Sequence, residues 1–314
     1  MTDIDNTQDE KDEDNIEDKS YDLSDIGNLV SMFRDELNDD QIKKHVSNHL
    51  KEMVSSSKLD KYRVVFLYDD YTSINSTHSN KIYQSISDLN KSKDILLILQ
   101  SGGGKIEPAY LISKTCKRLC KKKFVISIPR RAKSAATLIS LGANELHMGL
   151  LSELGPIDPQ FNGFPASGLA NAMEKIAEMA CRFPGSSDLF AKYLTDNLDI
   201  KDLGYFERIN ESAAQYAERL LKGKKLPEPW SEESLSNHLT NHYKDHGFVI
   251  DSDEATSLLG KPMVKENTEE YELGNKVYEF LDFLDLAYGI FREKNISYVG
   301  GLEDGLKVFD KPEN

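Results

Sequence analysis

The sequence predicts an α/β protein built around a parallel sheet. Three apolar runs, at residues 94–99, 124–128 and 145–148, are too short for helices and are bounded by turn residues. Runs of this kind are typical of strands that are covered on both faces, as the strands of parallel sheets are. The segments between them place apolar residues at three- and four-residue steps, which is helical spacing. Strands that alternate with helices at this period imply right-handed βαβ units.

The other elements follow from the same periodicities. Residues 23–59 carry a helical pattern, and the apolar run 63–68 predicts a further buried strand. The remaining expectations are a polar loop at 72–80, helices at 81–89, 106–121, 134–142 and 169–182, a loop at 149–164 rich in glycine and proline, and a mostly helical region from 201 that is interrupted at 225–230 and 246–251. We therefore expect a helical N-terminal segment at 23–60, a core at 61–200 and a mostly helical C-terminal extension at 201–314.

Residues 1–22 predict a disordered acidic tail. The first 20 residues hold nine acidic residues and two lysines, which leaves a net charge of −7 out of −14 for the whole chain. No aromatic residue lies among them. A segment this charged and this poor in apolar side chains cannot bury enough surface to fold on its own.

Composition argues against several classes of protein. Lys and Arg number 39 against 53 Asp and Glu, whereas general nucleic-acid binding depends on a positive surface. Cys116, Cys120 and Cys181 are too few for a disulfide framework, and their spacing does not fit a structural zinc site. No apolar run is long enough for a membrane span, and none near the N-terminus resembles a signal peptide. We therefore expect a cytoplasmic protein with no metal, no membrane span and no nucleic-acid partner.

Three consecutive glycines, Gly102, Gly103 and Gly104, follow the strand expected at 94–99 and precede a helix. Glycine permits positive φ and lets another group approach the backbone closely. Free N–H groups of such a turn can converge on an anion or a developing oxyanion. The alternative is a tight strand–helix turn with no chemical role. The nucleotide-binding patterns GxxxxGK[ST] and GxGxxG are both absent.

Ser134 begins the helix expected at 134–142, and its next neighbours are small. A serine in this position can act simply as the N-cap of the helix. It is equally a suitable place for a nucleophile, because the small neighbours leave room for a carbonyl substrate. The residue alone leaves both interpretations open.

Together these motifs resemble those of the Clp-fold serine peptidases, a group that spans the Clp peptidase subunit, signal peptide peptidase A and the crotonase-like folds. The nearest branch is the serine dehydrogenase proteinase family. Four stretches carry the resemblance: ILLILQSGGGKIEPAY (95–110), PRRAKSAATLISLGANELHMG (129–149), SELGPIDPQ (152–160) and HGFVIDSDEA (246–255). The resemblance implies a Clp/crotonase-like core of repeated ββα units.

The resemblance also implies roles for residues of the two loops. Ser134 matches the nucleophile, and Gly103, with Gly102 and Gly104 beside it, matches the glycines whose amide forms half of the oxyanion hole. The amide of Ala135 would form the other half. The implied protein is a serine peptidase that acts on polypeptides through an acyl-serine intermediate, works without a cofactor and assembles as a homo-oligomer.

The general base is the part of the site on which the family pattern is least informative. No histidine occupies the segment Gly155–Pro159, where the Clp peptidase carries one. Lys175, on the helix expected at 169–182, is the provisional base by similarity to signal peptide peptidase A, since a desolvated lysine can accept a proton. His246 is the other candidate, because histidine needs little tuning to act near pH 7. Asp158 could orient a base, and Lys133 is expected to bias the local field only.

Two other functions fit the same fold. A crotonase-like enzyme would use the oxyanion pocket on an acyl-CoA thioester and would not need Ser134. A catalytically inactive scaffold would keep the fold and the oligomer but lack a working base.

Overall fold

The computed structural model describes residues 20–161, 164–197 and 200–311. A sheet crosses this part of the molecule with the strand order β11-β10-β1-β2-β3-β5-β9, and the short strands β4 and β6 continue it beside β2. The strands are β1 (Tyr62–Asp69), β2 (Asp94–Ser101), β3 (Phe124–Ile128), β4 (Arg131–Ala132), β5 (Glu145–Met148), β6 (Glu153–Leu154), β9 (Val264–Lys265), β10 (Lys294–Gly300) and β11 (Leu306–Asp310). Strands β1, β2, β3, β5 and β9 pair in parallel, whereas β10 and β11 are antiparallel. The predicted α/β class with a parallel sheet is confirmed.

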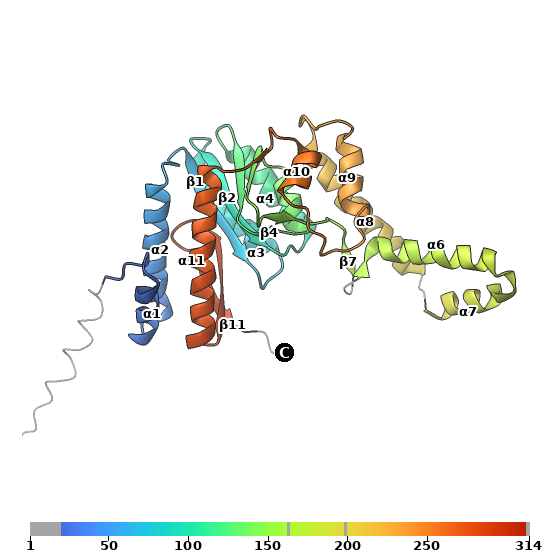
Figure 1. The fold of residues 1–314 in the computed structure, drawn as a ribbon, viewed down its shortest axis with the longest axis horizontal. Coiled ribbons are helices and arrows are strands. Elements are labelled where there is room, and N and C mark those ends of the chain that lie inside the picture. The colour runs from blue at the N-terminus through green and yellow to red at the C-terminus, as the bar shows by residue number, and fades with distance from the viewer. Residues whose placement is uncertain (1–19, 162–163, 198–199, 312–314) are drawn as a thin grey trace, which may run out of the picture.

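Helices cover both faces of the sheet (Figure 1). On one face lie α1 (Ile26–Arg34), α2 (Asp39–Ser56) and α11 (Glu269–Phe291), and on the other α3 (Ser76–Ile86), α4 (Ile106–Leu119), α5 (Ala135–Leu141), the second half of α8 (Ile200–Leu221), α9 (Glu232–Asn241) and α10 (Ser252–Leu259). Because side chains alternate along a strand, β1 contributes to both cores. Val64 and Phe66 pack against α1, α2 and α11, while Val65 and Leu67 pack against the other group.

One helical segment projects from this body. Helices α6 (Ala166–Arg182) and α7 (Ser187–Asn197), joined by the short 3-10 helix η2 (Pro184–Ser186), extend away from the sheet as an arm (Figure 1). The hairpin of β7 (Gln160–Phe161) and β8 (Phe164–Pro165) lies at the base of the arm. No helix in the described ranges is both long and apolar enough to cross a lipid bilayer.

The N-terminal part differs from the expectation in three places. The segment expected to be helical at 23–59 forms two helices, α1 and α2. Asn38 is the N-cap of α2 and forms a capping box, so a separate helix begins after it. Helix α3 begins inside the expected loop 72–80, since Asn75 caps it and its backbone N–H donates to His78 Nδ1. Tyr21 is buried, so ordered packing begins inside the segment expected as a tail, while residues 1–19 lie outside the described ones.

The C-terminal region is not only a helical extension. Strand β10 pairs antiparallel with β1, and β9 pairs parallel with β5, so both borders of the sheet come from residues after 201. The expectation for 201–314 missed these strands because β9 is two residues long and β10 follows directly on the long helix α11. The core therefore needs this region to complete its sheet.

Candidate active site

The glycine turn and Ser134 meet because their strands are neighbours. Ser101, at the end of β2, pairs in parallel with Ala132 of β4, and the N–H of Lys133 donates to the carbonyl of Ser101 at 3.0 Å. Parallel strands end at the same edge of a sheet, which is where ligand sites of α/β proteins form. The segments that follow the two strands therefore start side by side.

Gly103 contacts the turn at Ser134 so closely that no side chain fits at position 103. Its φ is 109°, and a Cβ atom on it would lie 2.8 Å from Ser134 Cβ and 2.8 Å from the carbonyl oxygen of Lys133. The turn is held from behind by Ile74, whose N–H donates to the carbonyl of Gly103 at 2.8 Å. Only glycine satisfies both the backbone conformation and the space.

Ser134 does not act as a helix cap. It occupies the N-cap position of α5, but its side chain makes no capping hydrogen bond. Its backbone has φ 51° and ψ −117°, a conformation that costs a non-glycine residue about 1–3 kcal/mol. Strain of this kind is concentrated at functional sites, and here it leaves the hydroxyl available to the adjoining groove.

Two backbone amides beside Ser134 are candidates for an oxyanion hole. Ala135 is the first residue of α5, so its N–H has no partner within the helix. The N–H of Gly103 donates to Ser101 Oγ at 3.1 Å. A bound oxyanion would therefore share the Gly103 N–H with the Ser101 hydroxyl, or displace this hydroxyl as the acceptor.

A groove of about 1030 Å³ runs past Ser134. Its lining brings together residues from six parts of the chain: Asp70, Tyr71, Thr72, Ser73, Gly102, Gly103, Gly104, Lys105, Ile106, Glu107, Ser134, Ile157, Pro159, Gln160, Arg208, Ile209, Ser212 and His246. The sequence candidates Ser134, the three glycines and His246 thus share one groove.

His246 is held by Asp158. Its Nδ1 lies 2.7 Å from Asp158 Oδ1, and the carboxylate also accepts a hydrogen bond from Gln160 Nε2 at 2.8 Å. Asp158 is buried, whereas His246 is partly exposed in the groove. An Nδ1–H donated to Asp158 leaves Nε2 as the basic nitrogen. Asp158 and His246 thus form a hydrogen-bonded pair, with the imidazole on the groove side.

Lys175 is not brought to this groove. It lies on α6, in the arm, where its Nζ contacts Glu178 Oε2 at 2.8 Å and its side chain is 71% exposed. A lysine in this setting is solvated rather than desolvated, so the condition for a neutral lysine base is not met at this position.

Thr137 connects helix α5 to the segment that carries Asp158. Its hydroxyl is buried, lies 2.6 Å from the carbonyl oxygen of Ala132 and accepts from the N–H of Gly155 at 3.0 Å. In the sequence, Thr137 is only one of the small residues that follow Ser134. Its hydroxyl was the available signal, because a buried hydroxyl must find hydrogen-bond partners.

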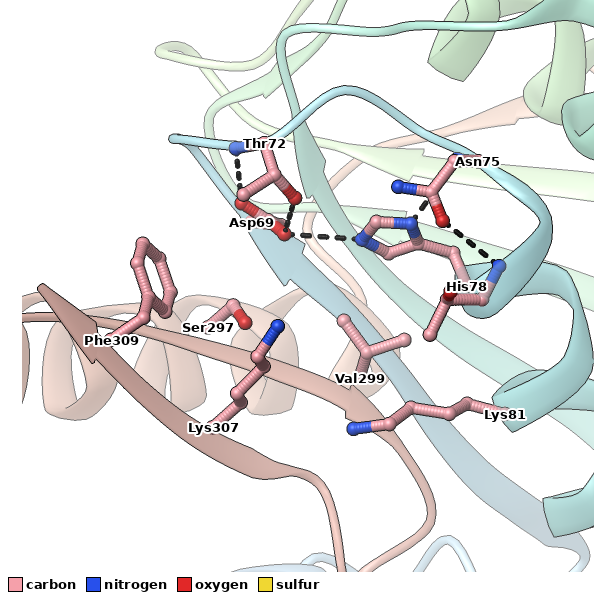
Figure 2. A pocket seen from close by; sticks show the side chains of 10 residues that line it. Asp69, Thr72, Asn75, His78, Lys81, Ser297, Val299, Lys307 and Phe309 are labelled. Atoms are coloured by element: carbon pink, nitrogen blue, oxygen red, sulfur yellow. Dashed lines mark hydrogen bonds and ion pairs between the residues drawn. The ribbon is translucent and has the colours of Figure 1, made fainter. Parts of the chain in front are cut away.

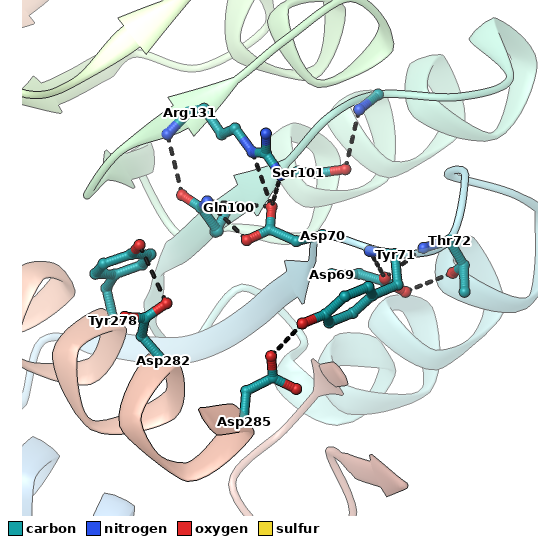
Figure 3. Close-up of polar contacts among 11 residues, drawn as sticks. Asp69, Asp70, Tyr71, Thr72, Gln100, Ser101, Arg131, Tyr278, Asp282 and Asp285 are labelled. Atoms are coloured by element: carbon teal, nitrogen blue, oxygen red, sulfur yellow. Dashed lines mark hydrogen bonds and ion pairs between the residues drawn. The ribbon is translucent and has the colours of Figure 1, made fainter. Parts of the chain in front are cut away.

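A second network fixes the strand ends beneath the groove (Figure 3). Asp70 accepts from Arg131 Nε and from Gln100 Nε2, each at 3.0 Å, and the backbone N–H of Arg131 donates to Gln100 Oε1 at 3.0 Å. These contacts join the ends of β1, β2 and β4. The hydroxyl of Tyr71 donates to Asp285 of α11 in the same view.

Asp69 and His78 form a pair outside the groove (Figure 2). Asp69 accepts from His78 Nε2 at 3.1 Å and from the hydroxyl of Thr72 at 2.5 Å. Burial raises the pKa of Asp69, but the hydrogen bonds from His78 and Thr72 outweigh it and lower the pKa below its usual value. Because His78 Nδ1 already accepts from the N–H of Asn75, both ring nitrogens are used. The pair is thus a structural support for the loop that follows β1.

The described residues contain no group of three or more His, Cys, Asp or Glu side chains arranged to bind a metal ion. The groups of the groove next to Ser134 include its hydroxyl, an imidazole held by a carboxylate, and backbone N–H groups. This is the set of groups required for nucleophilic acyl transfer.

Comparison with known proteins gives a family for the central segment. Residues 62–181 match the model of the ClpP-like SDH-type serine proteinases. Two uncharacterised proteins of Methanocaldococcus jannaschii are similar: one is 35% identical over 105 residues, 33% of this chain and 36% of the relative. The other is 26% identical over 219 residues, 70% of this chain and 66% of the relative. The chain thus spans about a third and two thirds of the lengths of these relatives.

Solved structures give weaker similarities. A membrane-bound stomatin-specific protease in complex with a substrate peptide aligns with a TM-score of 0.42 and 15% identity, covering 68% of this chain and 79% of that one. ClpP1 from Listeria monocytogenes aligns with a TM-score of 0.38 and 16% identity, covering 69% of this chain and 99% of that one. The family match includes the glycine turn, Ser134 and Asp158. Through residues 62–181, this chain is similar to the ClpP-like SDH-type serine proteinases.

Proposed function

We propose that this protein is a serine peptidase in which Ser134, His246 and Asp158 act as a nucleophile, a base and an orienting carboxylate. The observation that carries the proposal is the shared groove of Ser134 and His246, with His246 Nδ1 held 2.7 Å from a buried carboxylate. The family of residues 62–181 supports the same activity.

The first half of the reaction forms an acyl-enzyme. His246 Nε2 takes the proton of the Ser134 hydroxyl while Oγ bonds to the carbonyl carbon of the scissile peptide. The carbonyl oxygen becomes an oxyanion that accepts hydrogen bonds from the amides of Gly103 and Ala135. His246 then gives its proton to the leaving amine, and the C–N bond breaks.

The second half repeats these roles with water. His246 takes a proton from a water molecule, whose oxygen attacks the acyl carbon. The tetrahedral intermediate collapses, the proton passes to Ser134 Oγ, and the carboxylic acid product leaves. Each amide of the oxyanion hole contributes about 3 kcal/mol of transition-state stabilisation in enzymes of this kind.

A Ser–Lys dyad is the alternative chemistry for the base. It would require Lys175 to leave Glu178 and enter the groove, through movement of the arm or from a second copy of the chain. The exposed setting of Lys175 gives this alternative less support than the His246–Asp158 pair.

We also propose that the protein acts on polypeptides in the cytoplasm and assembles as a homo-oligomer. Large apolar side chains are exposed at Leu150 and Leu151, and on the arm at Phe183, Leu189 and Tyr193. Large apolar side chains exposed on a surface are often buried in contacts between proteins. Light scattering on the full chain tests this part: a monomer at all concentrations would contradict it.

Covalent labelling with a fluorophosphonate tests the proposed activity. Wild-type protein should be labelled and should hydrolyse peptide substrates, whereas Ser134→Ala should do neither. Ser140→Ala, a buried serine on the same helix whose hydroxyl bonds to a helix carbonyl, is the matched control and should be labelled. Turnover of acyl-CoA thioesters that persists in Ser134→Ala would instead indicate a crotonase-like enzyme, and inactivity towards all these reagents would indicate a scaffold.

A further inference from the structure

We propose that Lys133 is a positioning residue that holds the loop carrying His246 against the turn carrying Ser134. The inference rests on the proposed function, because it assigns to Lys133 the placement of the base relative to the nucleophile. It is drawn from the surroundings of one ammonium group, in which three segments of the chain meet.

The ammonium of Lys133 contacts the loop that follows α9 and the strand that precedes Asp158. Its Nζ lies 2.9 Å from the carbonyl oxygen of Phe248 and 3.4 Å from that of Gly247. It also lies 3.3 Å from the carbonyl oxygen of Leu154 and 2.9 Å from Glu153 Oε2. Hydrogen bonds from a charged donor are about twice as strong as neutral ones.

The stem of Lys133 is fixed as firmly as its head. The side chain is only 13% exposed, and a Cβ atom on Gly155 would lie 2.6 Å from Lys133 Cδ. Its backbone N–H donates to Ser101, and its carbonyl oxygen is packed against Gly103. Lys133 is therefore anchored to the glycine turn through its backbone and to the His246 loop through its side chain.

Besides Lys133, the loop is held by the hydrogen bond of His246 to Asp158 and by the ring contact of Phe248 with Tyr243, but neither contact involves the carbonyls of Gly247 and Phe248. Phe248 and Val249 are 43% and 52% exposed, so burial does not hold that part of the loop. The bridge between Leu154 and Ile250 secures only its far end. Removing the ammonium would leave the carbonyls of Gly247 and Phe248 without a protein donor and free the backbone next to His246.

Lys133 is suited to positioning and not to accepting a proton from Ser134. An ammonium has three donors and no acceptor. Here the donors face carbonyl oxygens of the loop and of β6 and the carboxylate of Glu153, and none of these partners belongs to the Ser134 turn. The role is thus exerted through His246.

Hydrogen–deuterium exchange tests the inference without depending on activity. Lys133→Met keeps the stem and removes the charge, and Lys133→Arg restores a charged donor. We expect faster exchange at residues 245–250 in Lys133→Met, partial restoration in Lys133→Arg and no change in β3. Lys123→Met is the matched control, since Lys123 lies just before β3 and pairs with Glu145 at the start of β5, at the opposite end of these strands from Lys133. Exchange at 245–250 equal to wild type in Lys133→Met overturns the inference.

The rate of fluorophosphonate labelling supplies the second arm. Lys133→Met should react about 100-fold more slowly than wild type, the loss expected when a reacting group is misplaced by about 1 Å. In a His246→Gln background the same substitution should change the rate less than twofold, because there is no base left to position. A further loss in that background, or equal inactivity of Lys133→Met and Lys133→Arg with unchanged exchange, overturns the inference. If wild type is never labelled, the proposed function fails, and exchange alone decides the role of Lys133.

Discussion

The two candidate bases lie in regions of opposite character. His246 belongs to an irregular loop, yet its ring is tied to a buried carboxylate and its neighbours Gly247 and Phe248 to an ammonium. Lys175 belongs to a regular helix, yet that helix projects from the body, and the exposed side chain pairs with Glu178 on the same helix. Regular secondary structure therefore does not show which of the two side chains is held in place. The polar contacts that each side chain makes with distant segments show it.

Removing each candidate base in turn tests this contrast most directly. His246→Gln should lower kcat for peptide hydrolysis by about 10⁴-fold or more, since loss of the base disables the nucleophile. Lys175→Met should change kcat less than twofold. His242→Gln, an exposed histidine at the start of the same loop, controls for general effects on the loop. A reversed order, with Lys175→Met inactive and His246→Gln active, would establish the Ser–Lys dyad.

Asp158→Asn tests whether the carboxylate of Asp158 orients His246 during catalysis. The amide keeps the shape of the side chain, but it can no longer hold the imidazolium that forms during the reaction. We expect a fall in kcat of up to about 10⁴-fold with little change in KM. Steady-state kinetics would measure both quantities. An effect confined to KM would indicate that Asp158 contributes to substrate binding and not to orienting His246.

A smaller effect is expected where the glycine turn meets Ser134. Gly103→Ala places a methyl group 2.8 Å from Ser134 Cβ and imposes an unfavourable φ, so the turn must shift. We expect kcat to fall about 10²–10³-fold, the loss typical of one oxyanion donor. Gly102→Ala is the matched control, because a Cβ atom there meets nothing within 4 Å. Equal activity of the two variants would argue against a catalytic role for the turn.

These residues also mark what the sequence alone could predict. The strand at 124–128, the glycine turn and the serine at the start of α5 follow from local patterns, and adjacent parallel strands then bring the two loops together. The provisional choice of Lys175 rests on similarity to signal peptide peptidase A and on its place along the chain, and neither carries information on whether a side chain is desolvated. His246, Asp158 and Lys133 meet through contacts between segments far apart in sequence, and only their three-dimensional packing determines that meeting. Strands β9 and β10 escaped prediction for the same reason, since pairing partners and not periodicity define them.

The last prediction concerns the junction between the arm and the body. Helix α8 connects them, and just after it Lys224 is largely buried and donates to the carbonyl of Ala143. Burial, with a smaller contribution from Lys117, lowers the pKa of Lys224 to about 7. Between pH 7 and the pKa near 10.5 of the unfolded chain, the unfolded state binds one more proton, so the free energy of unfolding should rise with pH.

Lys224→Met should remove this dependence. One group contributes at most about 1.4 kcal/mol per pH unit, so the slope of wild type between pH 7.5 and 9.5 should exceed that of the variant by up to this amount. Denaturant unfolding at the two pH values measures it, with Lys222→Met, an exposed neighbour, as the control. Because the uncharged variant no longer has an amine to desolvate, it should also be the more stable protein near neutral pH. Equal slopes in the three proteins would mean that Lys224 stays charged and hydrated. The end of α8 would then pack less tightly on the body than the loop that carries His246.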